Sequence, residues 1–122
     1  MMKTAFASLI GFAVSAALLA ANSPAEQGKD VFAKRCSGCH DLDRDKEGPR
    51  LRGVFGRTAG KVATFSYSDG LKAAAFTWDK ALLDKWLTNP DSVVKDTDMA
   101  FHLENASERE QVIAWLRSLS QK

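Results

Sequence analysis

Cys36-Ser37-Gly38-Cys39-His40 contains both cysteines of the 122-residue sequence and one of its two histidines. Two thiols three residues apart can add across the two vinyl groups on one edge of a haem, and the next residue then directs its imidazole at the iron. This spacing is the attachment signature of c-type haem. We therefore expect one covalently bound haem c, with Cys36 and Cys39 as attachment points and His40 as an iron ligand.

Three other uses of these cysteines explain less of the pattern. A thioredoxin-like redox pair lies at the head of a helix in a strand-helix-strand unit, and the sequence contains no such unit. A zinc site takes four ligands, so it would have to recruit His102 as well as His40. A short-loop disulfide between Cys36 and Cys39 stays open, because oxidising compartments permit it.

The composition limits the classes of protein that fit the sequence. A hydrophobic fraction of 45% and a charged fraction of 26% are typical of one ordinary globular domain. The 17 Lys and Arg residues against 15 Asp and Glu residues give a net charge of +2, with no block of like charge. A surface for DNA or another nucleic acid requires a dense basic field, so no nucleic-acid partner is expected. Two cysteines so close together also exclude a disulfide-rich secreted scaffold.

Residues 1–25 are interpreted as a secretory signal peptide. Lys3 is followed by 22 residues without a charge, and after the apolar run 5–21 come small residues and a proline, up to residue 25. Cleavage within 20–25 would leave a domain at 26–122 and place the protein in the periplasm. The alternative is an uncleaved membrane anchor, because an apolar stretch of about 20 residues can span a bilayer. The Ala, Gly and Ser content makes this stretch weakly hydrophobic, which favours cleavage.

The mature domain is predicted to be all-α, because no stretch shows the alternation of a strand and no internal repeat occurs. Amphipathic or capped stretches predict four helices, at 26–35, 69–75, 79–88 and 107–120. Ser68 is the expected N-cap of the second helix, and Asn89-Pro90 ends the third. Ser107 and Glu110 are expected to form a capping box for the fourth.

Long irregular segments separate these helices, one from Cys36 to about residue 68 and one at 91–106. Loops of this length in a compact domain are usually functional or disordered. The first segment is rich in Gly, Pro, Asp and Arg, with these apolar residues among them: Leu51, Val54, Phe55 and Phe65. It is therefore predicted to wrap around an apolar group.

The opposite face of the iron has two candidate ligands. Met1 and Met2 leave with the signal peptide, so Met99 and His102 supply the remaining thioether and imidazole. A single methionine is commonly core filler, but Met99 lies in an irregular segment without helical period. His/Met ligation is the pairing of electron-transfer haems. Met99 is therefore expected to bind the iron, and His102 to be a solvated loop residue.

The mature chain resembles the class I c-type cytochromes, close to mitochondrial cytochrome c and its bacterial periplasmic relatives. The resemblance covers nearly the whole mature chain, and short matches stand in register with the haem motif: Gly28-Lys29, Phe32, Gly48-Pro49, Leu51, Gly53, Phe55-Gly56-Arg57, Ser66-Tyr67-Ser68-Asp69, Thr77-Trp78, Leu87, Asn89-Pro90, Thr97, Met99, Phe101, Glu108-Arg109-Glu110 and Trp115-Leu116. It implies the cytochrome c fold, in which several short helices and loops wrap around one covalently attached haem.

The resemblance also implies roles for residues around the haem. It implies that the Pro49 carbonyl accepts a hydrogen bond from His40. It implies further that Arg57, Tyr67 and Trp78 bind the haem propionates. A guanidinium, a phenol and an indole can each donate to a carboxylate, which fits this assignment.

A second implication of the resemblance concerns packing away from the haem. Gly28, Phe32 and Trp115 match the contact between the first and last helices of the family, which gives Gly28 a close-approach role. Trp86 and Phe55 are interpreted as ordinary core residues.

The segment before Met99 departs from the family's pattern. The family commonly has Tyr, then Pro-Gly, then Lys, where this sequence has Val93, Lys95-Asp96 and Asp98. Loss of a phenol and of a stiff Pro-Gly turn is expected to lower loop rigidity and the strength of the bond from Met99 to the iron. Asp98 and the acidic residues of 41–47 also interrupt the lysine ring that many relatives use for docking, so the polarity of the partner does not carry over.

The expected function is one-electron transfer outside the cytoplasmic membrane, and not enzyme catalysis. With two protein ligands the iron has no open position for a substrate, and a methionine ligand favours the ferrous state. The expected partners are redox proteins such as an oxidase, a reductase or a dehydrogenase, which dock briefly with a monomer. Contact with a membrane is expected only if the signal peptide is retained.

Two alternative functions stay open. An easily displaced Met99 would make the protein a haem enzyme or a gas-binding sensor, and the altered loop before Met99 motivates this alternative. The domain could otherwise be the dedicated cytochrome subunit of one dehydrogenase.

Overall fold

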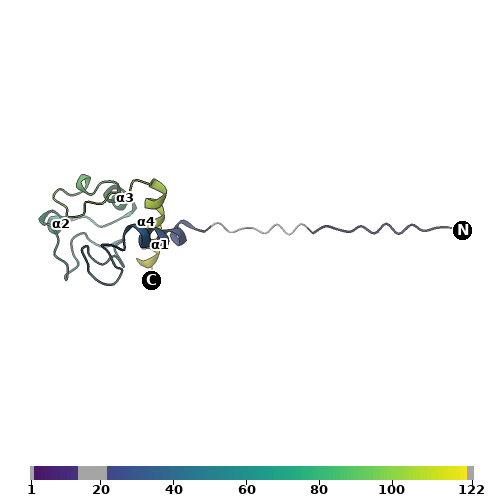
Figure 1. Ribbon diagram of the computed structural model, residues 1–122, viewed down its shortest axis with the longest axis horizontal. Helices are drawn as coiled ribbons and strands as arrows, with labels where there is room; N and C mark the ends of the chain where they lie inside the picture. The colour runs from purple at the N-terminus through teal and green to yellow at the C-terminus, as the bar shows by residue number, and fades with distance from the viewer. Residues whose placement is uncertain (1, 14–21, 121–122) are drawn as a thin grey trace.

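The computed structural model describes residues 2–13 and 22–120, and all its helices lie in the second range (Figure 1). In chain order they are α1 (Pro24–Arg35), α2 (Asp69–Ala73), α3 (Lys80–Thr88), the 3₁₀ turn η1 (Pro90–Ser92) and α4 (Ala106–Ser120). Extended pairing within these two ranges is limited to one isolated bridge between Thr58 and Thr77. The prediction of an all-α fold built from short helices and long loops is confirmed.

The predicted signal peptide lies partly outside the described residues, which omit positions 1 and 14–21. Residues 2–13 contain no helix or strand. No helix in the described part of the chain has the length and apolar character that a bilayer crossing requires. The division into a signal peptide and a domain stays a prediction.

Helix α1 begins at Pro24, two residues earlier than predicted. The Ser23 hydroxyl accepts the Glu26 backbone N–H, and the Glu26 carboxylate accepts the Ser23 backbone N–H at 2.8 Å. This reciprocal capping box satisfies two of the backbone donors that a helix start leaves unpaired. Pro24 suits the first helical position, where no N–H is needed. Two residues three positions apart in the sequence, Ser23 and Glu26, therefore determine where α1 begins.

Helix α4 has a different cap from the one predicted. The Asn105 side chain accepts the Glu108 backbone N–H at 3.0 Å, which makes Asn105 the N-cap. The capping box predicted between Ser107 and Glu110 is therefore wrong. Asn is as effective as Ser at a helix start, and this register places Glu108 in the first turn. There the carboxylate pairs with Arg35 of α1 at 3.1 Å.

Helices α2 and α3 begin close to the predicted positions. Ser68 and Asp79 are their N-caps, and each side chain accepts a backbone N–H of the first turn, at 3.4 and 2.8 Å. Helix α2 ends at Ala73, two residues before its predicted end, while α3 ends immediately before Asn89-Pro90 as predicted. The proline restricts the residue before it to extended backbone, which ends the helix.

Helices α1 and α4 pack against each other at one end of the domain (Figure 1). Gly28 permits this close approach, because a side chain there would overlap the Gln111 backbone carbonyl and the Trp115 side chain. The rings of Phe32 and Trp115 pack with centroids 5.1 Å apart. The contact predicted for Gly28, Phe32 and Trp115 is confirmed.

The core is apolar and draws on helices and loops alike. Its buried hydrophobic residues are Val31, Phe32, Val54, Ala59, Trp78, Leu83, Trp86, Leu87, Val94, Leu103, Val112, Ile113 and Leu116. No polar or charged residue in the described ranges is buried. Trp86 and Trp78 place two large rings of this core beside the loops that carry the candidate site.

Candidate functional site

His40 follows α1 and is fixed by hydrogen bonds from its near neighbours in sequence. The backbone N–H groups of Cys39 and His40 donate to the Cys36 carbonyl, at 3.1 and 2.9 Å, so the motif forms a tight turn. The Nδ1 atom of His40 donates to the Pro49 carbonyl at 2.8 Å. This bond orients the ring and leaves Nε2 as the unprotonated nitrogen, which can bind a metal.

Gly48 lies directly against the ring of His40. Its backbone N–H donates to the Cys39 carbonyl at 2.9 Å, and a Cβ at this position would overlap the imidazole. Burial lowers the pKa of His40 below its ordinary value, and the charges of Lys46 and Arg57 act in the same direction. The hydrogen bond to the carbonyl opposes these effects. The imidazole is therefore neutral at pH 7, the form that binds a metal.

The two cysteines are free thiols in different surroundings. Cys36, at the end of α1, is partly buried, and desolvation raises the pKa of its thiol to about 11. Cys39 is exposed, and its thiol donates to the Glu47 carboxylate at 3.3 Å. Over the described ranges, no group of His, Cys, Asp and Glu side chains is arranged to bind a metal ion such as zinc. Two reduced thiols at this spacing suit thioether attachment.

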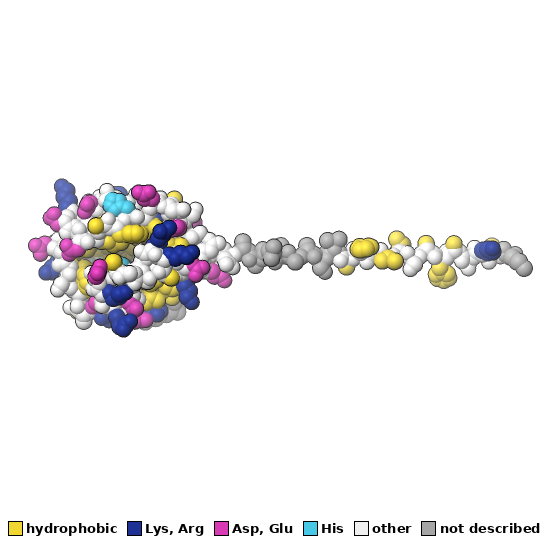
Figure 2. Space-filling view, viewed as in Figure 1, with side chains coloured by type: hydrophobic (Ala, Val, Ile, Leu, Met, Phe, Trp, Pro, Cys, Tyr) yellow, Lys and Arg dark blue, Asp and Glu magenta, His cyan; other side chains and the backbone are white. Residues whose placement is uncertain are grey.

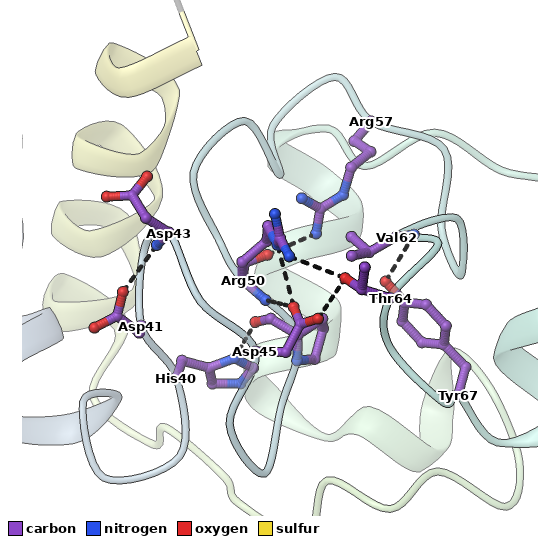
Figure 3. A network of polar contacts seen from close by, with 10 residues as sticks. His40, Asp41, Asp43, Asp45, Arg50, Arg57, Val62, Thr64 and Tyr67 are labelled. Carbon is purple, nitrogen blue, oxygen red and sulfur yellow. Dashed lines mark hydrogen bonds and ion pairs between the residues drawn. The ribbon is translucent and has the colours of Figure 1, made fainter.

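A polar network joins the loop after His40 to the loop 58–67 (Figure 3). The Asp45 carboxylate accepts Nε of Arg50 at 3.2 Å and the hydroxyl of Thr64 at 2.5 Å. Arg50 also donates to the Thr64 oxygen at 2.9 Å. These contacts lower the pKa of Asp45 to about 2, and the hydrogen bond from Thr64 contributes most. The network therefore links the two loops while Asp45 is ionised.

Arg57 is half-buried, and its guanidinium has few partners. Nη2 donates to the Arg50 carbonyl at 3.1 Å (Figure 3), and the ion pairs of the described residues do not include Arg57. Burial lowers the pKa of this guanidinium from its ordinary value. A guanidinium carries five N–H donors and can bind a carboxylate at two points. A half-buried cation with a carbonyl as its partner indicates a position for an anion beside it.

Tyr67 and Trp78 are neighbours of Arg57. The Tyr67 hydroxyl accepts the Val62 backbone N–H at 3.1 Å, which leaves its own proton for another acceptor. Tyr67 also acts electrostatically on Arg57 and opposes the fall in its pKa. The backbone N–H of Trp78 donates to the Arg57 carbonyl at 2.9 Å. The three residues assigned to the propionates thus lie together, and their role stays a prediction.

Met99 is half-buried and packs against the core. Trp86 of α3 donates its indole N–H to the Met99 sulfur, with Nε1 and Sδ 3.1 Å apart. The backbone N–H of Met99 donates to the Thr97 hydroxyl oxygen at 3.2 Å. His102, the other candidate ligand, is exposed. The thioether therefore lies against the core while the second imidazole lies in solvent, and binding of Met99 to iron stays a prediction.

Trp86 has a contact that the sequence did not reveal. Its interpretation as a core residue is confirmed by its exposed fraction of 8%, but its N–H reaches a sulfur 13 positions further along the chain. No local period can show such a contact, because it joins a helix to a loop that folds back over it. The available signal was chemical, since a buried indole usually finds an acceptor for its N–H.

The loop before Met99 combines an anchor with backbone strain. Val94 is buried and lies close to Gly70, where a Cβ would overlap the Val94 side chain. Asp96 has a φ of 62°, in the left-handed region that costs a residue with a side chain about 1 kcal/mol or more. The strained residue belongs to Lys95-Asp96, the pair that stands where the family commonly has Pro-Gly.

One face of the domain has apolar side chains gathered in a hollow across its middle, with charged side chains around it (Figure 2). The half-buried apolar residues packed against the core are Cys36, Leu42, Leu51, Phe55, Leu71, Ala74, Phe76, Leu82, Val93, Met99 and Trp115. The two free thiols, the unprotonated imidazole nitrogen, the core-facing thioether and the cluster of donors fit a haem with its two propionates.

Known proteins resemble this chain in sequence and in fold. The profile of the family described as Cytochrome c matches residues 25–120. Cytochrome c2 of Rhodomicrobium vannielii is 40% identical over 121 residues, which cover 94% of this chain and 95% of the relative. Cytochrome c of Euglena viridis is 39% identical over 98 residues, which cover 78% and 96%. The solved structure of cytochrome cH from Methylobacterium extorquens has a TM-score of 0.72 and 35% identity, and the match covers 77% of this chain and 97% of that one.

Proposed function

The chain belongs to the cytochrome c family, whose members carry covalent haem c and transfer electrons rather than catalyse reactions, and on that premise we propose that His40 and Met99 are its two axial iron ligands. The observation that carries this proposal is that the structure offers one imidazole and one thioether in environments suited to binding a metal. The His40 imidazole is neutral and donates a hydrogen bond to the Pro49 carbonyl, and the Met99 thioether packs against the core. Such a pair suits one-electron transfer.

On the His40 side, the chain supplies the attachment and the first ligand in this proposal. Bound haem c provides one iron atom that alternates between Fe(II) and Fe(III). Cys36 and Cys39 are the attachment points, and Nε2 of His40 is the ligand atom because Nδ1 donates to Pro49. That hydrogen bond fixes the ring and increases its basicity as a ligand.

In the proposal Met99 would be the second residue that holds the iron, through its thioether sulfur. A thioether favours the ferrous state, and an apolar pocket disfavours the more highly charged ferric state, so both raise the reduction potential. With both side chains bound, the iron would have no position for a substrate. This arrangement supports a carrier that passes single electrons between redox partners.

Arg57, Tyr67 and Trp78 are proposed to bind the propionates. Two carboxylates at the edge of an apolar hollow need donors, because a poorly solvated charge without a partner is strongly unfavourable. The free donor capacity of Arg57 and Tyr67 supports this role. Charge-assisted hydrogen bonds from a guanidinium are among the stronger ones in proteins.

One observation favours a second candidate, a haem protein that binds small ligands after losing Met99 from the iron. Asp96 is strained in the loop that carries Met99, and strained segments are often part of a switch. Rapid binding of carbon monoxide to the reduced wild-type protein would support this candidate against the carrier.

Export to the periplasm is part of the proposal, with a signal peptide that lies within residues 1–25 and is cleaved in the zone 20–25, ahead of the haem domain. The family match begins at residue 25, and α1 begins at Pro24, which supports this boundary. The N-cap Ser23 stabilises α1 only if cleavage occurs before it, so we expect the mature chain to retain Ser23. An intact mass of the exported protein measures the cut and the haem together, and a full-length mass would indicate a retained anchor.

The proposal is tested by Met99→Ala in the haem-loaded protein, with His102→Ala as the matched control. Met99→Ala should keep covalent haem, lose the long-wavelength absorption band of thioether-ligated ferric haem, and have a lower midpoint potential. His102→Ala should resemble the wild type in all three measurements. An unchanged potential and spectrum in Met99→Ala, or loss of the band in His102→Ala, would overturn the assignment.

A further inference from the structure

We propose that the Asp45 carboxylate acts on the His40 ligand through a single peptide unit, which makes Asp45 a positioning residue. That peptide joins Pro49 to Arg50, and its carbonyl accepts the Nδ1–H of His40 at 2.8 Å. The N–H of the same peptide donates to Oδ1 of Asp45 at 3.1 Å. Two hydrogen bonds and one peptide therefore connect the carboxylate to the imidazole (Figure 3). This inference rests on the proposed function, because it takes His40 as an iron ligand.

The Asp45 carboxylate is held in place by three donors. Besides the peptide N–H, Nε of Arg50 donates to Oδ1 at 3.2 Å, and the Thr64 hydroxyl donates to Oδ2. The Asp45 side chain is 18% exposed. Donation from Thr64 and Arg50 lowers the pKa of Asp45 to about 2, so the peptide N–H meets an anion at pH 7. The carboxylate is therefore a negative charge with a fixed place.

The peptide transmits the effect of this charge to the imidazole. Hydrogen bonds in series strengthen one another, because each bond polarises the next group. An anion at the N–H end of a peptide increases the negative charge on the carbonyl oxygen at the other end. The Pro49 oxygen then becomes a stronger acceptor for the Nδ1 proton of His40. A stronger bond at Nδ1 increases the basicity of Nε2, the ligand nitrogen.

A more basic imidazole changes the balance between the two oxidation states. Fe(III) depends on donation from its ligands more than Fe(II) does, so Asp45 should favour the ferric state and lower the reduction potential. A methionine ligand favours the ferrous state. The two sides of the proposed site would then act on the potential in opposite directions.

Asp43 offers a comparison within the same loop. Its carboxylate pairs with Arg52 through two hydrogen bonds, at 2.7 and 3.1 Å, and its side chain is 64% exposed. Within the described ranges, Arg52 supplies both donors to this carboxylate. Asp43 therefore has the same charge and the same kind of partner as Asp45, without the contact with a peptide that leads to His40.

The first test is Asp45→Asn in the haem-loaded protein, with Asp43→Asn as the matched control. Asn keeps an oxygen that accepts the peptide N–H but removes the charge, and each change leaves one arginine without its carboxylate. In Asp45→Asn we expect the ferrous state to gain about threefold over the ferric state, which is a rise of about 28 mV at 59 mV per tenfold change. In Asp43→Asn we expect the wild-type potential, because solvent and salt screen an exposed charge. Equal potentials in the two variants would overturn the inference.

The Nδ1 proton of His40 reports the strength of the hydrogen bond directly. In proton NMR of the reduced holoprotein, its resonance should move upfield in Asp45→Asn, because a weaker hydrogen bond leaves the proton more shielded. The resonance should keep its wild-type position in Asp43→Asn. An unmoved resonance in Asp45→Asn would overturn the inference even if the potential rises, since net charge alone would then explain the rise.

Thr64→Val separates the charge on the peptide from the link between the two loops. It removes the hydroxyl that connects Asp45 to the loop 58–67 and leaves the carboxylate on the Arg50 N–H. The Thr64 hydroxyl also draws negative charge from the carboxylate, so its loss should not raise the potential. A rise equal to that of Asp45→Asn would show that the link between the loops sets the potential, and it would overturn the inference.

The failure of this inference and the failure of the proposed function give different results. The ring protons of an imidazole bound to haem iron are shifted upfield by the porphyrin. If the reduced holoprotein lacks such protons from His40, then His40 is not a ligand and the proposed function fails. If it shows them while Asp45→Asn keeps the wild-type potential and Nδ1 resonance, then the ligand assignment stands and the role of Asp45 is wrong.

Discussion

The His40 side and the Met99 side of the hollow are constructed differently. His40 is held within one continuous segment, by its turn onto Cys36, by the Pro49 carbonyl and by the backbone of Gly48. Met99 is held by an indole from α3 and by one hydrogen bond in a loop that contains a strained residue. One ligand position is therefore formed locally, whereas the other exists only once the whole domain has folded.

This difference has a consequence for stability. Local unfolding begins where backbone strain is present and few contacts must break. We therefore expect the Met99 side to open before the His40 side. Substitutions on the two sides should then have different effects. A substitution near His40 should lower the stability of the whole holoprotein, whereas a substitution near Met99 should change how readily the Met99 ligand is exchanged.

The largest effect is expected from Gly48→Ala. The added Cβ would overlap the His40 ring, and neither the ring nor the backbone can move without breaking the hydrogen bonds at Pro49 and Cys39. We expect a loss of about 3 kcal/mol in the free energy of unfolding, or failure to load haem. Urea unfolding of the purified holoprotein measures the first, and haem content per chain the second.

Gly38→Ala is the matched control for that change. Gly38 lies between the two cysteines, and a Cβ there would have no atom within 4 Å. The free energy of unfolding should change by less than about 1 kcal/mol. Equal losses in Gly38→Ala and Gly48→Ala would show that the close contact with His40 is unimportant.

A smaller effect, of opposite sign, is expected on the Met99 side from Asp96→Gly. Glycine adopts the φ of 62° without strain, so the closed loop should gain about 0.5–1 kcal/mol after allowing for the freer unfolded chain. Imidazole added to the ferric protein should then displace Met99 about two- to fivefold less readily. Absorption titration measures this affinity.

Asp98→Gly removes the same charge from the same loop at a residue whose φ is not positive. We expect imidazole to bind this control no more weakly than it binds the wild type. An equal loss of affinity in both variants would assign the effect to charge, and the strain at Asp96 would then have no role in ligand exchange.

The smallest effect is expected at low pH from Asp45→Asn, in the network that supports the His40 side. The pKa of Asp45 is about 2 in the folded protein, below its ordinary value near 3.8. Its contribution to stability is therefore complete above pH 4 and is lost as the pH falls toward 2. The variant should be slightly less stable at pH 7, and its stability should fall less steeply between pH 4 and pH 2.

Urea unfolding at a series of pH values measures this difference. Glu104→Gln is the control, because Glu104 is exposed and forms none of the ion pairs of the described residues. Parallel acid profiles for the wild type and Asp45→Asn would contradict the contribution assigned to the network.

The sequence could predict the parts of this molecule that depend on local chemistry. Ser68 and Asn89-Pro90 marked helix ends because capping and the restriction before proline act within a few residues. The prediction of Ser107 as the cap of α4 was wrong, because Asn105 competes with it as a cap two residues earlier. The ion pair of Glu108 with Arg35 favours the earlier register.

The candidate site divides in the same way. The motif around His40 could be found from spacing, because its residues are neighbours in the chain. The contact of Trp86 with Met99 and the positive φ of Asp96 could not, because both depend on how α3 and a distant loop meet. Tertiary contacts of this kind leave no period in the sequence.

Proton NMR of the reduced holoprotein tests the central claim most directly. A thioether methyl held over the haem lies in the strong ring current of the porphyrin, so the Met99 methyl should give one three-proton resonance far upfield of the other methyl signals. Met99→Ala should abolish that resonance, while His102→Ala should retain it. A paramagnetic, five-coordinate spectrum without that resonance would contradict the account.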